Sequence, residues 1–300
     1  MDNIELLTHW PLQPQQALQL VDLLLVVLLF LAARYSHGWF SGVDSTKELA
    51  ERDNVAFGIS VAGGIIALAI TISGVFLQPA SADLLWHSAR LLALGLGSLL
   101  LIRLGRICFD KWGMDRFDKR ELILEGNVPV AIVDAAVACA IAFMLKGAMQ
   151  WFGRLYWGTI PMLVVNFIGA MALLILISRF LERRYAKFNQ GGSLQQALVH
   201  GHMPVAIRHS GYLLACGLIM LASGQSEQLQ ADTPVFNMAL WFAISFGKLL
   251  LLMLLSTLLR RVVLAQVKVS DEIERQNNGG VAALEAALIF AAAYLLNHVI

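Results

Sequence analysis

Among the ionisable residues that stand inside long apolar segments of this 300-residue sequence, five are candidates for a functional site. They are Asp134, Arg208, His209, Glu285 and Lys248. A charged side chain at the centre of a membrane costs about 2.5–3.5 kcal/mol on insertion scales, so such residues usually pair with one another or mark a path for ions or protons. The chemistry that these residue types favour is therefore the binding and transfer of ions or protons.

Four of these five residues share a position relative to a recurring residue. Asp134, His209 and Glu285 each follow an Asn or His by seven residues, and Arg208 follows one by six. At a rise of about 1.5 Å per residue, they form one layer about 10 Å above the helix starts. Three interpretations stay open: ion pairs in which the two acids neutralise Arg208 and His209, a polar layer along a permeation or proton path, and snorkelling to the interface.

Lys248 is the deepest of the charges, near the middle of its apolar segment. A buried ammonium group needs a partner, and we expect Glu285 or Asn166 to supply it. The alternative is that the amine is uncharged.

The recurring residues, which we call the repeat anchors, are spaced by 73, 75 and 76 residues. They are Asn54, Asn127, His202 and Asn278. Asn accepts hydrogen bonds from the free N–H groups at a helix start, so we predict that the anchors are helix caps. A ring of Asn and His side chains that lines a cytoplasmic mouth is the alternative, and both can hold together.

A polar segment precedes each anchor and carries an acidic residue at one aligned position. The acids are Glu48, Glu121 and Glu272, and the third repeat has Gln196 instead. An aliphatic residue or Ala follows each. The pattern is consistent with either a short amphipathic helix at the membrane surface or a solvated loop.

The apolar segments that carry these residues are long enough to cross a membrane. The sequence is 58% hydrophobic and 14% charged, whereas soluble domains carry about 25% charged residues. A span needs roughly 20 apolar residues. We therefore predict an all-α polytopic membrane protein with eight transmembrane helices, near residues 17–35, 55–76, 84–105, 128–147, 155–180, 203–223, 235–260 and 281–299.

The distribution of Lys and Arg predicts the orientation of the spans. The four longer connections and their flanks hold 17 of the 22 basic residues. The positive-inside rule places these connections in the cytoplasm and both termini on the periplasmic side. The net charge of +1 gives no basic footprint for nucleic acid.

Each repeat consists of one span, a cytoplasmic polar segment and a second span. Two spans restore the chain direction, so we predict four parallel two-helix repeats about an axis near the membrane normal, in two domains, 1–150 and 151–300. The second spans are rich in small residues, such as Ala135, Ala287 and Ala291. We expect these even-numbered spans to form the interior and the Leu-rich odd-numbered spans to face lipid.

The repeat motif resembles a known family. An acidic-aliphatic pair precedes an opening of the form Asn-x-x-aliphatic-Ala, as in Glu121-Leu122 and Asn127-Val128-Pro129-Val130-Ala131. This is similar to the YjfL-like bacterial inner-membrane proteins, a domain-of-unknown-function family (number 350). The resemblance implies two such domains in tandem, a bacterial inner-membrane location and a link to envelope stress, and it supplies no catalytic residues. The third repeat departs from the motif at Gln196-Ala197 and His202.

Two functional interpretations follow from the sequence. The leading one is a channel or transporter for an ion or small solute, lined or gated by the five intramembrane residues. The alternative is a non-transporting scaffold that docks a cytoplasmic protein through the basic connections and the Glu-Leu segments. We expect no enzyme, cofactor or metal site, because cytoplasmic connections of about 20 residues are too short for a catalytic domain. Besides the lipid bilayer, a homo-oligomer remains an open partner.

Overall fold

The structure is a computed structural model that describes residues 14–77, 83–149, 159–224 and 234–299. Within these ranges the chain forms helices and turns and contains no strand, which confirms the all-α prediction. The predicted positions 155–158 of the fifth span lie outside the described residues.

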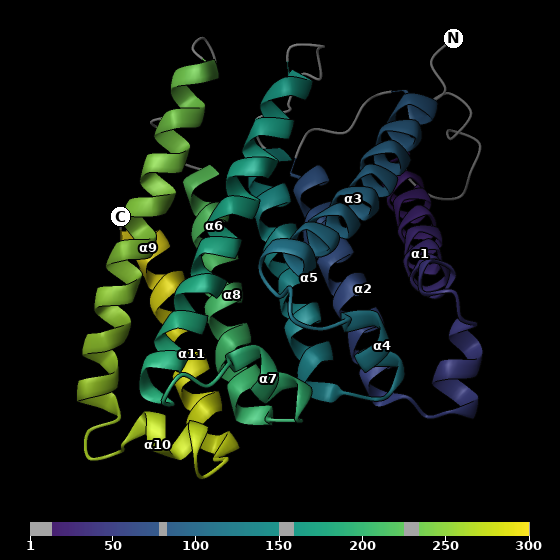
Figure 1. Cartoon of the computed structure of the whole chain (residues 1–300). Helices are drawn as coiled ribbons and strands as arrows, with labels where there is room; N and C mark the ends of the chain where they lie inside the picture. The colour runs from purple at the N-terminus through teal and green to yellow at the C-terminus, as the bar shows by residue number, and fades with distance from the viewer. Residues whose placement is uncertain (1–13, 78–82, 150–158, 225–233, 300) are drawn as a thin grey trace.

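Eight helices of the described chain are long and apolar enough to span a membrane. They are α1 (Pro14–Ser41), α2 (Val55–Val75), α3 (Leu84–Trp112), α5 (Val128–Met149), α6 (Thr159–Phe188), α8 (Met203–Gly224), α9 (Pro234–Val263) and α11 (Gly279–Val299). Figure 1 shows them as the long ribbons of the molecule. In lipid, a helix satisfies its backbone hydrogen bonds internally, which explains why apolar blocks of this length adopt this form.

The helix bounds differ from the predicted spans in one systematic way. The even-numbered spans begin one residue after their anchors, close to the predicted positions, but α1, α3 and α6 extend six to eight residues beyond their predicted ends. Hydropathy marks where the membrane ends, whereas a helix continues until a turn residue stops it. Gly113, for example, directly follows α3. These extensions carry charged residues that become important below.

A short helical segment joins the two spans of each repeat. These segments are the π-helical turn η2 (Lys47–Glu51) and the helices α4 (Lys119–Leu124), α7 (Leu194–Val199) and α10 (Val269–Glu274). Ile123, Leu198 and Ile273 are each at most 5% exposed, so the α-helical members each bury an aliphatic side chain. The structure therefore decides for short helices over solvated loops.

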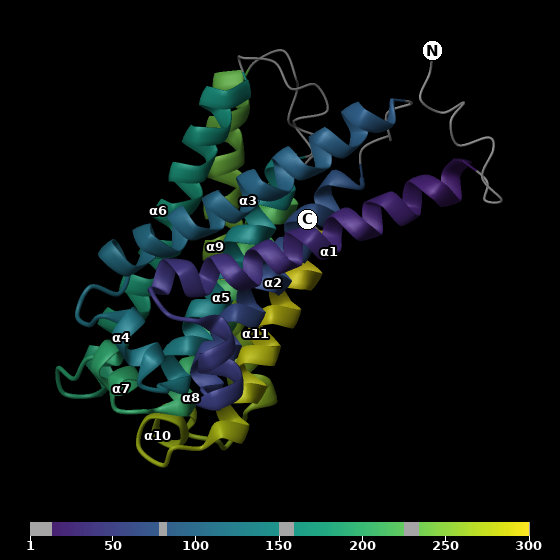
Figure 2. The same cartoon turned by 90° about the vertical axis from the view of Figure 1, so that its right-hand side faces the viewer.

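The long helices alternate in direction, as Figures 1 and 2 show. The short helices gather at one end of the molecule, and α1 begins and α11 ends toward the other. An even number of spans requires this arrangement, because each pair of spans returns the chain to the side where it began.

The eight spans pack in two layers. The even-numbered spans form a row in the order α2, α5, α8, α11, and the odd-numbered spans α1, α3, α6 and α9 form a second row against it. Figure 1 places α1 and α9 at opposite edges of the molecule. The four repeats therefore succeed one another along a line within the described chain, instead of closing about one axis near the membrane normal as expected from the sequence.

Small residues hold the even-numbered row together. A Cβ added to Gly63 would collide with Ala135, and one added to Gly211 would collide with Ala286. Such close backbone approach is the usual role of small residues in membrane helices. In α5 and α8, 78% of the most apolar window is buried, against 11% in α1. The predicted interior is thus confirmed for the two central spans.

The last span of the row, α11, departs from that prediction. In α11 only 33% of the most apolar window is buried, the same share as in odd-numbered α3. Ala287, which we expected inside, is exposed. The reason is that α11 has an even-numbered neighbour on one side only.

Candidate functional site

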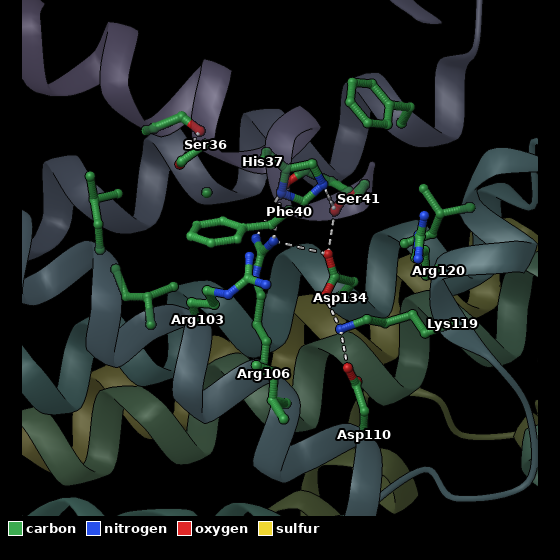
Figure 3. Close-up of a pocket in the computed structure, with 18 of the residues that line it drawn as sticks. Ser36, His37, Phe40, Ser41, Arg103, Arg106, Asp110, Lys119, Arg120 and Asp134 are labelled. Atoms are coloured by element: carbon green, nitrogen blue, oxygen red, sulfur yellow. Dashed lines mark hydrogen bonds and ion pairs between the residues drawn. The ribbon is translucent and has the colours of Figure 1, made fainter. Parts of the chain in front are cut away.

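A cavity of about 460 Å³ lies between α1, α2 and α3, toward the end of the molecule where α4 lies. Leucines of α3, including Leu96, Leu99 and Leu100, form much of its apolar wall. Its polar end gathers side chains from several elements. Figure 3 shows His37, Arg106, Asp110, Lys119 and Asp134 directed toward one another there.

Asp134 is the centre of the polar end and is 2% exposed. Its Oδ1 lies 2.7 Å from Lys119 Nζ, and its Oδ2 lies 3.3 Å from Arg106 Nη1. Ser60 Oγ donates a hydrogen bond to Oδ2. A buried carboxylate is tolerated only when charges and hydrogen bonds compensate its lost hydration, and here three groups do so.

The polar network continues on both sides of Asp134. Lys119 Nζ also lies 2.6 Å from Asp110 Oδ2. On the other side, Ser60 Oγ is 3.2 Å from His37 Nε2, and His37 Nδ1 is 3.4 Å from Arg106 Nη1. One connected set of polar groups therefore reaches from α1 to α3.

The network defines the tautomer of His37. The Ser60 hydroxyl has one proton and donates it to the Asp134 carboxylate, so it accepts a hydrogen bond from His37 Nε2–H. The unprotonated Nδ1 then accepts from the Arg106 guanidinium. A neutral imidazole satisfies both contacts at once, whereas a doubly protonated ring would point an N–H at the cation.

The cavity carries an excess of positive charge. Arg103, Arg106, Lys119 and Arg120 line it, against the carboxylates of Asp110 and Asp134. Arg103 stacks over Phe40, with its Cζ 3.2 Å from the ring centroid. Neither Arg103 nor Arg120 forms an ion pair with any residue that the structure describes. Arg103 and Arg106 point toward the same part of the cavity in Figure 3.

The other predicted members of the polar layer lie outside this cavity. Arg208 Nη2 is 2.7 Å from Glu274 of α10, and Arg260 Nη1 is 3.2 Å from Glu285. His209 is 1% exposed and has Ser178 Oγ 3.4 Å from its Nε2. The layer is therefore divided among the repeats instead of forming one cluster.

Neither Arg208 nor His209 lies at ion-pair distance from Asp134 or Glu285. Each of the two acids instead pairs with an arginine from the odd-numbered span of its own repeat, Arg106 for Asp134 and Arg260 for Glu285. The first span of a repeat packs directly on the second span of the same repeat, which brings these side chains together.

The expected partners of Lys248 are also wrong. Glu285 is paired with Arg260, and the buried Asn166 makes no hydrogen bond to Lys248. Lys248 is partly exposed on α9. Among the described residues it has no ion-pair partner.

The anchors cap their helices in three of the four repeats, as predicted. The Oδ1 atoms of Asn54, Asn127 and Asn278 accept from backbone N–H groups three residues later, at 3.0–3.1 Å. His202 makes no such side-chain bond. The residue before every anchor has a positive φ, and these residues are Asp53, Gly126, Gly201 and Asn277. All four repeats thus share one turn geometry.

Two of the anchors also link their repeat to the next one. Asn54 Nδ2 donates to the carbonyls of Ile123 and Leu124, both at 3.1 Å. Asn127 Nδ2 donates to the carbonyls of Leu198 and Val199, at 3.2 and 2.9 Å. The acceptors are the equivalent two residues of the short helix in each following repeat.

The three acidic positions have different environments. Glu48 is 2% exposed and accepts from Arg52 and from the anchor Asn54. Glu272 accepts from the anchor Asn278 at 2.9 Å. Glu121 is exposed. Two of the three acids therefore face their own anchors.

Sequence reasoning missed several members of the cavity. It singled out Asp134, but Arg106 and Lys119 were counted among the cytoplasmic basic residues, and His37 and Asp110 were not considered. The available signal was Arg106 and Asp110 four residues apart just past the predicted end of a span. No group of three or more His, Cys, Asp or Glu side chains in the described parts of the chain is placed to hold a metal ion.

The eight apolar helices and their buried charges define a multi-pass membrane protein. The sequence model of one family, described as Domain of Unknown Function (DUF350), matches residues 12–149, 82–223 and 154–300. Together these matches cover nearly the whole chain, which therefore belongs to this family. No curated protein and no solved structure matches it.

The three matches overlap in a way that reflects the repeats. Residues 12–149 cover the first and second repeats, 82–223 the second and third, and 154–300 the third and fourth. The family domain therefore corresponds to two adjacent repeats. The division into domains 1–150 and 151–300 stays a prediction, because the middle match crosses that boundary.

Proposed function

We propose that this protein is a transporter or channel for a small anionic solute, which binds in the cavity between α1, α2 and α3. The observation that carries the proposal is the charge of the cavity. Two carboxylates compensate two of its four cationic side chains, and Arg103 and Arg120 remain without a carboxylate partner among the described residues.

The arrangement of the charges supports an anion in preference to a cation. Asp134 and Asp110 are already engaged by Lys119 and Arg106 at the polar end. Guanidinium groups form charge-assisted, planar hydrogen bonds with carboxylate or oxyanion ligands. An anion near Arg103 and Arg106 reduces their mutual repulsion, and the leucine wall suits a solute with an apolar part.

Uptake into liposomes tests this function directly. The purified protein is reconstituted, and uptake of chloride, nitrate, inorganic phosphate and benzoate is compared with that of empty liposomes. We expect at least one anion to enter faster with protein present. Replacing Arg106 by Gln removes a charged donor worth 1.5–3 kcal/mol, so that flux should fall about tenfold or more.

The matched control for that experiment is Arg261→Gln, an exposed position of α9 outside the cavity. It should keep the wild-type flux. If none of the four anions enters faster than into empty liposomes, the proposed function is wrong for these anions and for this cavity.

The environments of the acidic positions favour transport over the scaffold alternative. A docking surface made of the Glu-Leu segments needs its acids to face the cytoplasm, but Glu48 and Glu272 bind their own anchors. Only Glu121 is exposed among the three. We further propose that the protein is not an enzyme, since the Ser60 hydroxyl, which lies beside His37 in the cavity, donates its proton to Asp134 and accepts a hydrogen bond from His37 instead of being activated by it as a nucleophile.

We also propose that the protein resides in the bacterial inner membrane with both termini on the periplasmic side. The four longer connections, which contain the short helices, and their flanks hold 17 of the 22 Lys and Arg residues, which is the distribution expected of a cytoplasmic face. In a background without native cysteines, Leu77→Cys should react with an impermeant thiol reagent in intact cells, and Glu125→Cys should react only after permeabilisation. The reverse pattern would mean that the orientation is inverted.

A further inference from the structure

The interfaces between successive even-numbered spans bring equivalent positions of the repeats into contact. Gly63 and Gly211, both nine residues after their anchors, lie against Ala135 and Ala286, both eight residues after theirs. Each even-numbered span (α2, α5, α8 or α11) has two sides in this row. We call the side that packs on the following repeat its forward face, and the side that packs on the preceding repeat its backward face. Each internal interface joins a forward face to a backward face.

The forward face carries small residues in all four repeats. At nine and thirteen residues after the anchor stand Gly63 and Ala67, Ala136 and Ala140, Gly211 and Ala215, and Ala287 and Ala291. The first three pairs are buried against the next helix, whereas Ala287 and Ala291 are exposed. A helix face that only contacts lipid has no need of small residues, which serve close helix approach.

The backward face shows the same pattern at the other end of the row. At eight and fifteen residues after the anchor stand Ala62 and Ala69, Ala135 and Ala142, Ser210 and Gly217, and Ala286 and Ala293. Only Ala62 and Ala69, on α2, are exposed at both positions. The row therefore ends in one unpartnered backward face on α2 and one unpartnered forward face on α11.

The anchor of the last repeat is an independent indication. Asn54 Nδ2 binds Glu48 of its own repeat and also reaches carbonyls of the following repeat, as Asn127 Nδ2 does. Among the described residues, Asn278 Nδ2 makes only the bond within its own repeat, to Glu272. In the shared register, the carbonyls that Asn278 would reach are those of Ala50 and Glu51 in η2 of another copy.

The packing of the odd-numbered spans also indicates a missing neighbour beside α2. Helices α3, α6 and α9 each pack on the second span of their own repeat and on the second span of the preceding repeat. Helix α1 has no preceding repeat in the described chain and packs on α2 and α3, and its most apolar window is the least buried of all. An α11 placed before α2 would supply the second wall that α1 lacks.

We propose that copies of this chain associate head to tail in the membrane, with the forward face of α11 on one copy packed against the backward face of α2 on the next. The occupant of each open face is a second copy because the repeat interface already contains both complementary halves. Such a heterologous contact closes into a ring or extends as a row, depending on its rotation. The association does not depend on the proposed transport.

Disulfide cross-linking in native membranes tests the register. In the full chain with Cys108, Cys139 and Cys216 replaced by Ala, the double variant Ala62→Cys/Ala287→Cys places one thiol on each open face. We expect oxidation to give covalent dimers and larger species. Each single variant, and the control pair Ala62→Cys/Leu254→Cys with its second thiol on the exposed side of α9, should form no covalent dimers.

The mass of the purified wild-type protein in nanodiscs gives a second measurement that does not depend on any cysteine. We expect multiples of the 32.9 kDa chain, and a shift toward single chains in Ala287→Leu/Ala291→Leu but not in Leu254→Ala. Single chains in wild type, or cross-linking of the double variant no greater than that of the control pair, would overturn the proposal. Anion uptake by a single-chain protein would leave the proposed function standing on its own.

Discussion

Asp134 and Glu285 occupy the same position of two repeats but are stabilised to different extents. Asp134 receives Lys119, Arg106 and Ser60. Glu285 is 0% exposed and has Arg260 alone at ion-pair distance. The compensation of a buried acid thus depends on how many neighbouring elements can reach it, and α2, α3 and the segment before α5 all reach Asp134.

Replacing Asp134 by Asn should destabilise the protein strongly. The amide keeps the shape of the side chain but leaves Arg106 without its carboxylate and Lys119 with Asp110 only. Breaking a buried ion pair by removing one partner costs about 3–5 kcal/mol. Unfolding in detergent, followed by circular dichroism against denaturant, measures the loss.

Asp271→Asn is the matched control for this substitution. Asp271 pairs with Arg275 at 3.5 Å, and their side chains are 43% and 65% exposed. Exposed pairs contribute at most about 1 kcal/mol. Equal losses in the two variants would mean that the Asp134 network does not stabilise the fold.

At this scale the sequence identified an acid but not its partners. Asp134 stands out because a carboxylate interrupts an apolar segment, and that signal is local. Its partners Arg106 and Lys119 lie in segments that hydropathy places outside the membrane, and only the extension of α3 to Trp112 and the fold of the turn before α4 bring them back. Pairing across elements depends on tertiary approach, which residue types alone do not encode.

At the scale of the element, each two-helix unit is closed by one turn. A residue with positive φ precedes the anchor in every repeat, the anchor caps the second span in three of the four, and in the first two repeats its amide continues to the next short helix. The cap was predicted, because Asn before an apolar block is a local signal. The amide bond across repeats was not, because it requires the neighbouring repeat at a particular height.

Asn127→Ala should therefore cost more than the loss of a cap. A lost cap costs about 0.5–2 kcal/mol, and each of the two bonds to Leu198 and Val199 adds about 1 kcal/mol. His202→Ala is the matched change, since His202 makes neither interaction. Thermal unfolding in detergent should show a clearly larger loss for Asn127→Ala, and similar losses would contradict the linking role.

At the scale of the whole molecule, hydropathy alone predicted the eight spans and their alternation. The constant spacing of the anchors predicted four parallel repeats. The row of even-numbered helices was not foreseen, because equal spacing along the chain is compatible with either a ring or a line. Ala287 and Ala291 distinguish the two arrangements, because they are exposed at the end of a line and would be covered in a ring.

The position of the cavity gives α1 a double role. This helix forms one wall of the cavity between α1, α2 and α3 and is also the span that borders the open end of the row. In the proposed head-to-tail assembly, α1 would lie between two molecules. We therefore expect the proposed assembly to bind solute cooperatively, whereas an isolated chain would bind it independently.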